Sequence, residues 1–353
     1  MKKDIRKYAG MDLGDRRSHL CVLDEDGKDL FEGTVATEPG AMRTFFESQE
    51  PMQIVIEVGT HSRWVDRLLR ELGHEVLVAN ARQVRLIYRS NKKNDRNDAQ
   101  MLARLGRLDP KLLFPLKHRT DEEWEDLDWV KTRATLVEER TRLINQIRGK
   151  VKSHGGRIPS CSAESFPKQA KAIVDQEGLK ALVPLLTIIS TVTAEIKKCD
   201  RQIQELSRTK YPETKVIQTA PGVGPVTALT YRLVLQTPDR FPNSRDVGSY
   251  LGLTPIQDQS GDSDKQKRIT KAGDRYLRTL LVQSAQYILG RFGPESPLKR
   301  WGLRLAERGG KNAKKRAVVA VARKLAVVLM AMWKSGQDYD VLRTGRKTVA
   351  RAA

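Results

Sequence analysis

A heptad pattern in the second half of the chain restricts the possible folds more than any other feature of the sequence. Over residues 182–206, apolar side chains recur in alternating steps of three and four, at Leu182, Leu185, Ile189, Val192, Ile196, Cys199, Ile203 and Leu206. This spacing gives a helix one continuous apolar stripe and is typical of coiled coils. We therefore expect a long helix that packs against a second helix, either in the same chain or across a dimer.

A suitable second helix precedes this pattern. From residue 120 the chain has no Pro and no Gly until Gly149, and apolar residues recur at Val130, Val137, Ile144 and Val151. Between the two helices, the Gly, Ser and Pro residues of 153–167 predict a loop. The sequence thus predicts a pair of long helices in the middle of the chain.

The first 118 residues show a different pattern, in which short strands alternate with helices. Apolar runs predict strands over 6–13, 18–24, 28–36, 53–59 and 74–80, and the turn EDGK predicts a hairpin between the second and third. Helices are expected over 40–48, over 62–72 and from about residue 95. Hairpins followed by strand–helix–strand crossovers predict an α/β unit with a mixed sheet flanked by helices.

The composition indicates a polyanionic partner. The 353 residues carry a formal net charge of +21, which favours nucleic acid over the weaker alternative of an anionic membrane surface. The charged N-terminus is not a signal peptide, and the apolar run over 317–333 is interrupted by Arg323 and Lys324, so no membrane span is expected. Three widely spaced cysteines fit a reducing compartment, and we expect a cytoplasmic protein.

Four acidic residues are expected to lie close together at one end of the predicted sheet. Asp12 and Glu57 end the first and fourth expected strands, and Asp95 and Asp98 lie three residues apart at the start of a helix. Ligands collect at the carboxyl ends of parallel strands, and clustered carboxylates repel one another unless they share a cation. Hard oxygen ligands suit Mg²⁺ or Mn²⁺. The alternative for the last two acids is structural, with Asp95 as the helix cap and Asp98 completing a capping box.

A second interpretation of the N-terminal segment is a phosphate-binding hairpin. The stretch DLGDRRSHLCVLDEDGK also suits the first phosphate loop of actin-like ATPases and sugar kinases. That fold needs a second Asp-x-Gly hairpin and a Gly-rich adenosine loop, and the sequence has neither. It also leaves the excess of positive charge unexplained.

The C-terminal third contains two further candidate motifs. Gly222 and Gly224, in TAPGVGPVTALT, resemble a helix-hairpin-helix turn, whose amides can meet a phosphate. Ser260 and Gly261 form either an ordinary turn or a nucleophile motif, and Ser263 competes for the same role. No His lies in this segment to act as a base. Cations that could support the charge on a phosphorane surround it: Lys265, Lys267, Arg268, Lys271, Arg275 and Arg278.

The ordered motifs MDLGDRRSHLCVLDEDG, IVIEVGTHSRWVDRLLRELGHEVLVANARQV, KKNDRNDAQMLARL, TAPGVGPVTALT, YLGLTPIQDQSG and ITKAGDRYLRTLLVQSA resemble the DEDD-type insertion-sequence transposases, the bridge-RNA-guided recombinases of bacterial mobile elements. The resemblance implies a RuvC-like domain with an RNase H fold over 1–118, a helical coiled-coil region for oligomerisation over 119–210, and a mainly helical transposase domain over 211–353. It also implies that Asp12, Glu57, Asp95 and Asp98 bind Mg²⁺. Ser260 would then join covalently to a DNA end.

The resemblance further implies the partners. These are donor and target DNA, a non-coding guide (bridge) RNA, and further copies of the chain in a homodimer or homotetramer, whose composite site joins the acids of one copy to the serine of another. Lys92, Lys93 and Arg96 beside the acids would then contact phosphates. Base pairing would read the sequence while the protein contacts backbone and shape. The alternative function is a RuvC-like nuclease or junction resolvase, in which water attacks the phosphodiester and Ser260 is a bystander.

Overall fold

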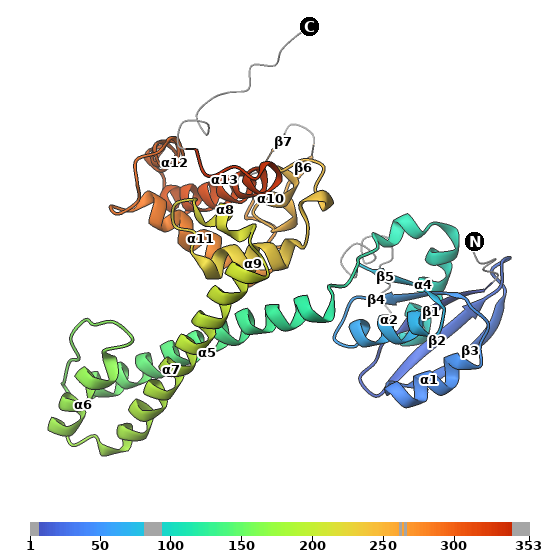
Figure 1. The fold of residues 1–353 in the computed structure, drawn as a ribbon, viewed down its shortest axis with the longest axis horizontal. Helices are drawn as coiled ribbons and strands as arrows, with labels where there is room; N and C mark the ends of the chain where they lie inside the picture. Colours follow the sequence, from blue (N-terminus) through green and yellow to red (C-terminus); the bar gives the residue numbers. More distant parts are fainter. Residues whose placement is uncertain (1–6, 81–93, 261–262, 265–266, 341–353) are drawn as a thin grey trace, which may run out of the picture. The chain divides into compact units, whose positions relative to one another are not determined.

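The computed structural model describes residues 7–80, 94–260, 263–264 and 267–340. The chain forms two compact units, Met1–His118 and Arg119–Ala353 (Figure 1). Each unit has its own hydrophobic core, and each is described by itself below.

The N-terminal unit contains a five-stranded mixed sheet, as the alternating pattern predicted. The strand order is β3-β2-β1-β4-β5, in which β1 pairs antiparallel with β2 and parallel with β4. The pair β2–β3 is antiparallel and the pair β4–β5 is parallel. The strands are β1 (Tyr8–Asp12), β2 (Arg17–Leu23), β3 (Asp29–Ala36), β4 (Gln53–Glu57) and β5 (Glu75–Ala79).

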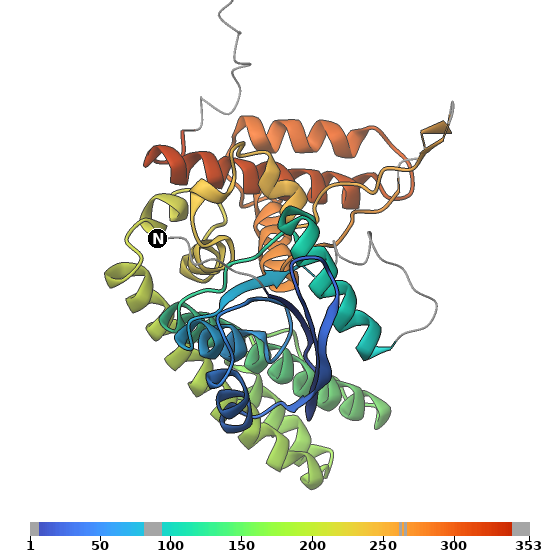
Figure 2. The same cartoon turned by 90° about the vertical axis from the view of Figure 1, so that its right-hand side faces the viewer.

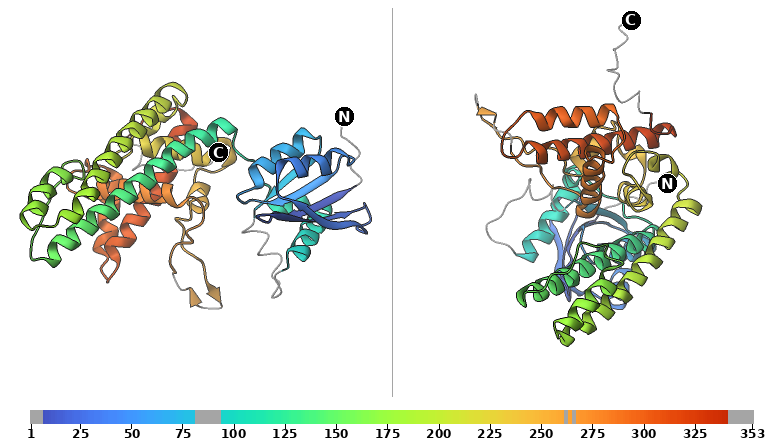
Figure 3. Two further views of the ribbon diagram at one scale, coloured as in Figure 1. Left: turned by 90° about the horizontal axis from the view of Figure 1, so that it is seen from below. Right: turned by 90° about the vertical axis from the view of Figure 1, so that its left-hand side faces the viewer.

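Helices cover both faces of this sheet (Figure 3, left). On one face, α1 (Pro39–Glu47) and α2 (Ser62–Glu71) pack on strand residues such as Met11 and Ile56. On the other face lies α4 (Asp95–Leu108), whose Leu102 meets Val55. Successive strand residues point to opposite faces, and both faces are covered, which explains why Ile54, Val55 and Ile56 in the middle of β4 are all apolar. The 3₁₀ turn η1 (Pro110–Leu113) follows α4.

The two long helices predicted in the middle of the chain are present. They are α5 (Asp121–Ser153) and α7 (Val183–Thr209), which pack side by side within the chain (Figure 1). Of the predicted heptad positions, Ile189 and all those from Ile196 onwards are buried, but Leu186 and Thr193 are buried where Leu185 and Val192 were expected. The difference at Leu186 arises because α6 (Phe166–Gln176) joins the pair there, and a third helix changes which side chains are covered.

Short and medium helices form the rest of the second unit around one core. The final apolar run becomes α13 (Ala313–Ser335), whose Leu325, Leu329 and Met330 are fully buried. Across the described parts of the chain, none of the helices combines the length and apolarity needed to span a bilayer. The other elements are η2 (Lys180–Leu182), α8 (Thr214–Gln218), α9 (Pro225–Leu235), η3 (Pro238–Arg240), α10 (Asp246–Tyr250), β6 (Gln259–Ser260), β7 (Ser263–Asp264), α11 (Arg275–Leu289) and α12 (Pro297–Glu307).

Candidate active site

Asp12 and Glu57 lie at the same edge of the sheet. The parallel register of β1 and β4 pairs Met11 with Ile56, and each acid is the next and last residue of its strand. Adjacent strands are about 4.8 Å apart, so the two carboxylates start from neighbouring backbone positions. Both side chains are partly exposed. The sheet therefore brings these two predicted site residues together.

A glycine contact fixes the level of α4 against this edge. A Cβ on Gly10 would lie 2.1 Å from the carbonyl oxygen of Ala99, so β1 and α4 touch backbone to backbone. The helix runs antiparallel to β1, because Arg107 near its end donates to the Glu25 carbonyl (3.0 Å) in the turn after β2. The first turn of α4 therefore faces the carboxyl end of β1.

The same contact sets the height of the remaining two acids. Asp95 precedes Ala99 by one helical turn, and Asp12 follows Gly10 by two strand residues. Both steps are about 6 Å along parallel lines, because a helix rises about 1.5 Å and a strand about 3.3 Å per residue. Asp95 therefore lies at the level of Asp12, and Asp98, three residues further along the helix, lies about 4.5 Å nearer to the level of Gly10, in the same half of the sheet.

The structural alternative for Asp95 is wrong. The N-cap of α4 is Asn94, whose side-chain oxygen accepts a hydrogen bond from the Arg96 amide (3.1 Å), and Asp95 is the first residue inside the helix. The helix is therefore capped without either aspartate side chain. Both acids lie in the first turn of the helix, where the helix dipole favours acidic residues.

The arrangement of these acids fits a divalent cation in donor type but does not enclose one. Within the described residues, which include all four acids, no three His, Cys, Asp or Glu side chains lie close enough together to hold a metal ion. Carboxylate oxygens are nevertheless the donors that Mg²⁺ and Mn²⁺ prefer. Of the neighbouring cations, Arg96 forms an ion pair with Glu32 of β3, while Lys92 and Lys93 lie outside the described residues.

Ser260 stands near the end of a two-stranded ribbon, where the sequence had indicated mainly turns. Its backbone in β6 pairs with Ser263 of β7, so the two candidate serines lie directly opposite each other. The pairing continues towards the base of the ribbon, where the Ile256 amide donates to the Arg268 carbonyl (2.9 Å) and the Thr270 amide to that of Thr254 (3.0 Å). Figure 2 shows the ribbon projecting away from the helices of its own unit.

The base of the ribbon is a close backbone crossing. Gly252 and Gly273 have positive φ angles of 65° and 69°, and Lys271 has the unusual value of 56°. A Cβ on Gly252 would lie 2.1 Å from the Ala272 amide nitrogen, and one on Gly273 would lie 2.3 Å from the Tyr250 carbonyl oxygen. Only glycine fits at these two positions, because both φ and space exclude a side chain.

Arg278 fastens this crossing to α11. Its Nη1 donates to the carbonyls of Leu251 (3.2 Å), Gly273 (3.3 Å), Asp274 (3.3 Å) and Ala272. Arg278 was predicted to contact nucleic acid, and the structure gives its guanidinium a structural task at the base of the ribbon. Asp274 in turn caps α11 and accepts from Lys131 Nζ of α5 (2.6 Å).

The other cations predicted around the serine have separate surroundings. Lys267 forms an ion pair with Asp258 across the ribbon, and Lys265 lies outside the described residues. Arg275 is exposed at the first position of α11. The structure therefore leaves Arg275 accessible to a phosphate, while it gives Lys267 a carboxylate partner.

The two glycines of the helix-hairpin-helix-like turn differ in role. Gly222 has φ 73° and packs on α11, where Ser284 Oγ donates to the Gly222 carbonyl (2.6 Å). Gly224 is the N-cap of α9, and a Cβ there would meet nothing within 4 Å. Gly222 is thus required for packing, whereas only Gly224 stands at an accessible helix start.

The residues described above fall within two regions that match known families. Residues 9–155 match a family model described as a transposase, and residues 214–299 match the model of the transposase IS116/IS110/IS902 family. The first region contains the four acids and the second contains Ser260.

Similarity to individual transposases extends over most of the chain. The transposase for insertion sequence element IS1111A of Coxiella burnetii is 29% identical, covering 96% of this chain and 92% of that protein. The putative transposase y4pF/y4sB of Sinorhizobium fredii is 30% identical over 84% of this chain and 77% of its own length. The pilin gene-inverting protein of Moraxella lacunata is 25% identical over 76% and 75%, respectively.

These matches define the class of the protein as a transposase, an enzyme that acts on DNA. Within that class, the chain belongs to the IS116/IS110/IS902 family. Sequence reasoning missed Gly10, whose signal was a glycine inside an apolar strand, where such a residue marks a close backbone approach.

Proposed function

We propose that this transposase recombines DNA at specific sites through the four acids of the N-terminal unit and a serine nucleophile on the ribbon. The observation that carries the proposal is the position of Asp12 and Glu57 at the ends of adjacent parallel strands, with the first turn of α4 at the same level. The strand order β3-β2-β1-β4-β5 supports a RuvC-like RNase H fold for this unit. The name of the pilin gene-inverting relative supports site-specific recombination.

In this proposal Asp12, Glu57, Asp95 and Asp98 hold Mg²⁺ or Mn²⁺ once nucleic acid is bound. The cation would supply charge stabilisation to the phosphodiester oxygens during bond exchange. The protein positions the acids through β1, β4 and α4, and the Gly10–Ala99 contact keeps α4 at the level of the strand ends. Negative charge at the N-terminus of α4 is favoured by the helix dipole.

Ser260 is the proposed nucleophile. Its Oγ attacks the phosphorus, an Oγ–P bond forms, the bond from phosphorus to the deoxyribose oxygen breaks, and the departing hydroxyl takes up the proton that the serine loses. The reverse reaction with a new DNA hydroxyl releases the serine. Each step exchanges one phosphate ester for another, so the sequence of steps needs no external source of energy. The ribbon that contains Ser260 projects away from the helices of its own unit (Figure 2).

The proposed assembly contains donor and target DNA, a guide RNA and two or four copies of the chain. The three parts 1–118, 119–210 and 211–353 would serve as acidic catalytic domain, oligomerisation region and transposase domain. Ile188 on α7 is 47% exposed, and this apolar side chain supports a contact between the long helices of two copies of the chain. Light scattering tests the assembly, which should have a mass two or four times 39.9 kDa, whereas a strictly monomeric protein with and without nucleic acid would contradict it.

A denaturing gel tests the chemistry. The protein, the RNA that copurifies with it and labelled DNA are incubated with Mg²⁺, and a covalent adduct is expected for the natural chain and for Ser263→Ala. Ser260→Ala should form none. Normal cutting without an adduct would instead favour a metal-dependent nuclease or junction resolvase, in which water replaces the serine.

A further inference from the structure

The helical hairpin α12–α13 concentrates positive charge. From residue 299 to residue 324 the chain has a single acid, Glu307, and ten basic residues: Lys299, Arg300, Arg304, Arg308, Lys311, Lys314, Lys315, Arg316, Arg323 and Lys324. Along α12 and its C-cap, Arg300, Arg304 and Arg308 follow one another at intervals of four residues, and all three are exposed. We call these three residues together with Lys324 the basic row.

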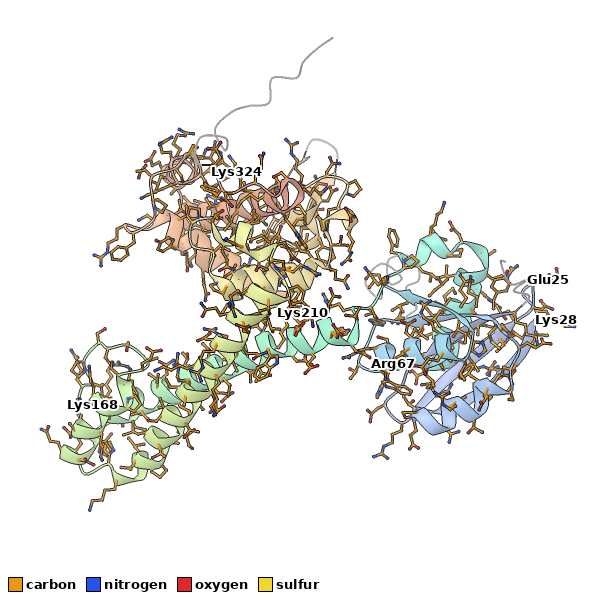
Figure 4. The ribbon with its side chains drawn as sticks, in the orientation of Figure 1. Glu25, Lys28, Arg67, Lys168, Lys210 and Lys324 are labelled. Carbon is orange, nitrogen blue, oxygen red and sulfur yellow. The ribbon has the colours of Figure 1, made fainter. Side chains whose placement is uncertain are left out.

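Lys324 joins the row from the second helix. The helices pack tightly, because a Cβ on Gly302 of α12 would lie 2.5 Å from Val321 Cγ2 of α13. One turn further on, the Lys324 ammonium lies 4.6 Å from the ring centre of Trp301, and Figure 4 labels Lys324 on α13 beside α12. Burial lowers the pKa of Lys324, and the charge of Arg304 lowers it further.

Within the parts of the chain that the structure describes, the cations of the basic row are not paired with acids, unlike the cations in the interior of the unit. Arg133 pairs with Asp200 and Arg232 pairs with Glu213, whereas among the described residues no ion pair involves any member of the row. A half-buried ammonium beside a guanidinium is unfavourable in the isolated chain, since like charges repel more strongly where water is partly excluded. An external anion would remove this cost.

We propose that the basic row binds the sugar–phosphate backbone of duplex DNA. Eight residues of α12 span about 12 Å, and duplex DNA presents one negative charge per about 1.7 Å of its axis, so several phosphates lie within reach. The fork of an arginine suits phosphate oxygens. Trp301 packs against the core and Lys324 lies over its ring, which favours backbone contacts over stacking on an unpaired base. This contact requires neither a metal nor Ser260.

The test measures binding alone. A triple variant of the full chain, Arg300→Gln, Arg304→Gln and Arg308→Gln, is compared with the natural chain by fluorescence anisotropy on a duplex of random sequence, in EDTA and over a series of salt concentrations. The expected result is a loss of affinity of about tenfold or more and a salt slope that is smaller by about 2 to 3, since each lost phosphate contact removes about 0.9.

A charge-matched control makes the result specific. The variant Lys171→Gln, Lys197→Gln and Arg201→Gln removes three exposed cations from α6 and α7 and should keep the natural slope. If the basic-row variant binds the duplex no more weakly than this control, the proposal is overturned. It is also overturned if duplex binding is unchanged and only the binding of a structured RNA falls.

A second measurement does not depend on any variant. Acetylation of the natural chain reports the accessibility of Lys324, which mass spectrometry reads directly. Bound duplex should slow acetylation of Lys324 at least about tenfold while Lys197 on α7 keeps its rate. Equal protection of the two lysines, or none at either, would contradict a phosphate contact at the row.

Discussion

Gly10 on β1 and Ala99 on α4 touch so closely that a Cβ on Gly10 would lie 2.1 Å from the Ala99 carbonyl oxygen. The contact joins the strand that ends in Asp12 to the helix that begins with Asp95 and Asp98. Any side chain at position 10 would push α4 away from the sheet. The atoms that it would meet belong to the backbone of α4, which cannot move aside as a flexible side chain can. The geometry of the acids therefore depends on a residue with no chemistry of its own.

The variant Gly10→Ala should lower both stability and activity. Overpacking at a closed contact typically costs 1–3 kcal/mol, so we expect a loss of about 2 kcal/mol and strongly reduced DNA cleavage. Thermal unfolding and a cleavage assay measure the two effects. The matched control is Gly40→Ala on α1, where a Cβ meets nothing within 4 Å and stability should hold or rise. Equal behaviour of the two variants would contradict the role of the contact.

Cys21 offers a chemical reporter of the same packing. The thiol is buried with Ala99 and Ala103 of α4, and burial, followed by the charges of Asp29 and Glu32, raises its pKa to about 11. The folded state thus favours the protonated thiol, so its contribution to stability is present below pH 9 and declines as the pH rises towards 11.

Alkylation of Cys21 should therefore be slow at pH 8 and should still accelerate between pH 9 and 10. Mass spectrometry of the labelled peptide gives the rate, and Gly10→Ala should increase it by exposing the thiol. A rate that levels off near pH 8.5 in the folded protein would show that the thiol is not buried beneath α4.

Removal of a strand-end carboxylate should abolish cleavage without loss of the fold. We expect Asp12→Ala and Glu57→Ala each to reduce metal-dependent cleavage by at least about a hundredfold, since each removes a proposed ligand and relieves repulsion between acids. DNA binding in EDTA should be retained. Glu75→Gln changes a carboxylate at the opposite edge of the same sheet and should cleave normally. Unchanged cleavage by either alanine variant would contradict the proposed metal site.

The variant Arg278→Gln should loosen the serine ribbon. It takes away the hydrogen bonds that Nη1 donates to the backbone at the crossing, and leaving such carbonyls unsatisfied costs about 1–3 kcal/mol. Trypsin should then cut faster after Lys267 and Arg268, and adduct formation should fall. Arg291→Gln, beyond the end of α11, serves as the control and should leave both rates unchanged. Identical proteolysis of the two variants would show that Arg278 does not hold the base of the ribbon in place.

Much of the architecture could be predicted because periodicity reports burial. The alternating strands placed Asp12 and Glu57 at strand ends, and the heptads predicted the buried stripe of α7 at Ile189 and from Ile196 onwards. The heptad prediction was wrong at Leu185 because α6 packs against this part of α7. This is a tertiary contact that cannot be predicted from the spacing of apolar residues within one helix. Asn94 as the helix cap was missed because an Asn and an Asp are both good caps, and only the backbone distinguishes them.

The ribbon could not be predicted from its residues. Ser260, Gly261 and Asp262 are typical of turns, and the strand pairing depends on a crossing fixed by Gly252, Gly273 and Arg278. In the basic row, only packing brings Lys324 of α13 beside the three arginines of α12 and its C-cap. Local composition therefore revealed which residues carry charge, while the fold decided which of them stand side by side.

The proposed serine mechanism is tested most directly by locating the amino acid that is joined to DNA. After reaction with Mg²⁺ and RNA, the adduct is digested with nuclease and trypsin, and the peptide of residues 246–265 is fragmented by mass spectrometry. Because this peptide contains Ser249, Ser260 and Ser263, the fragments assign the bond without a variant. We predict a nucleotide on Ser260 alone. A nucleotide on Ser263, or cleaved DNA with no modified peptide, would contradict the proposed mechanism.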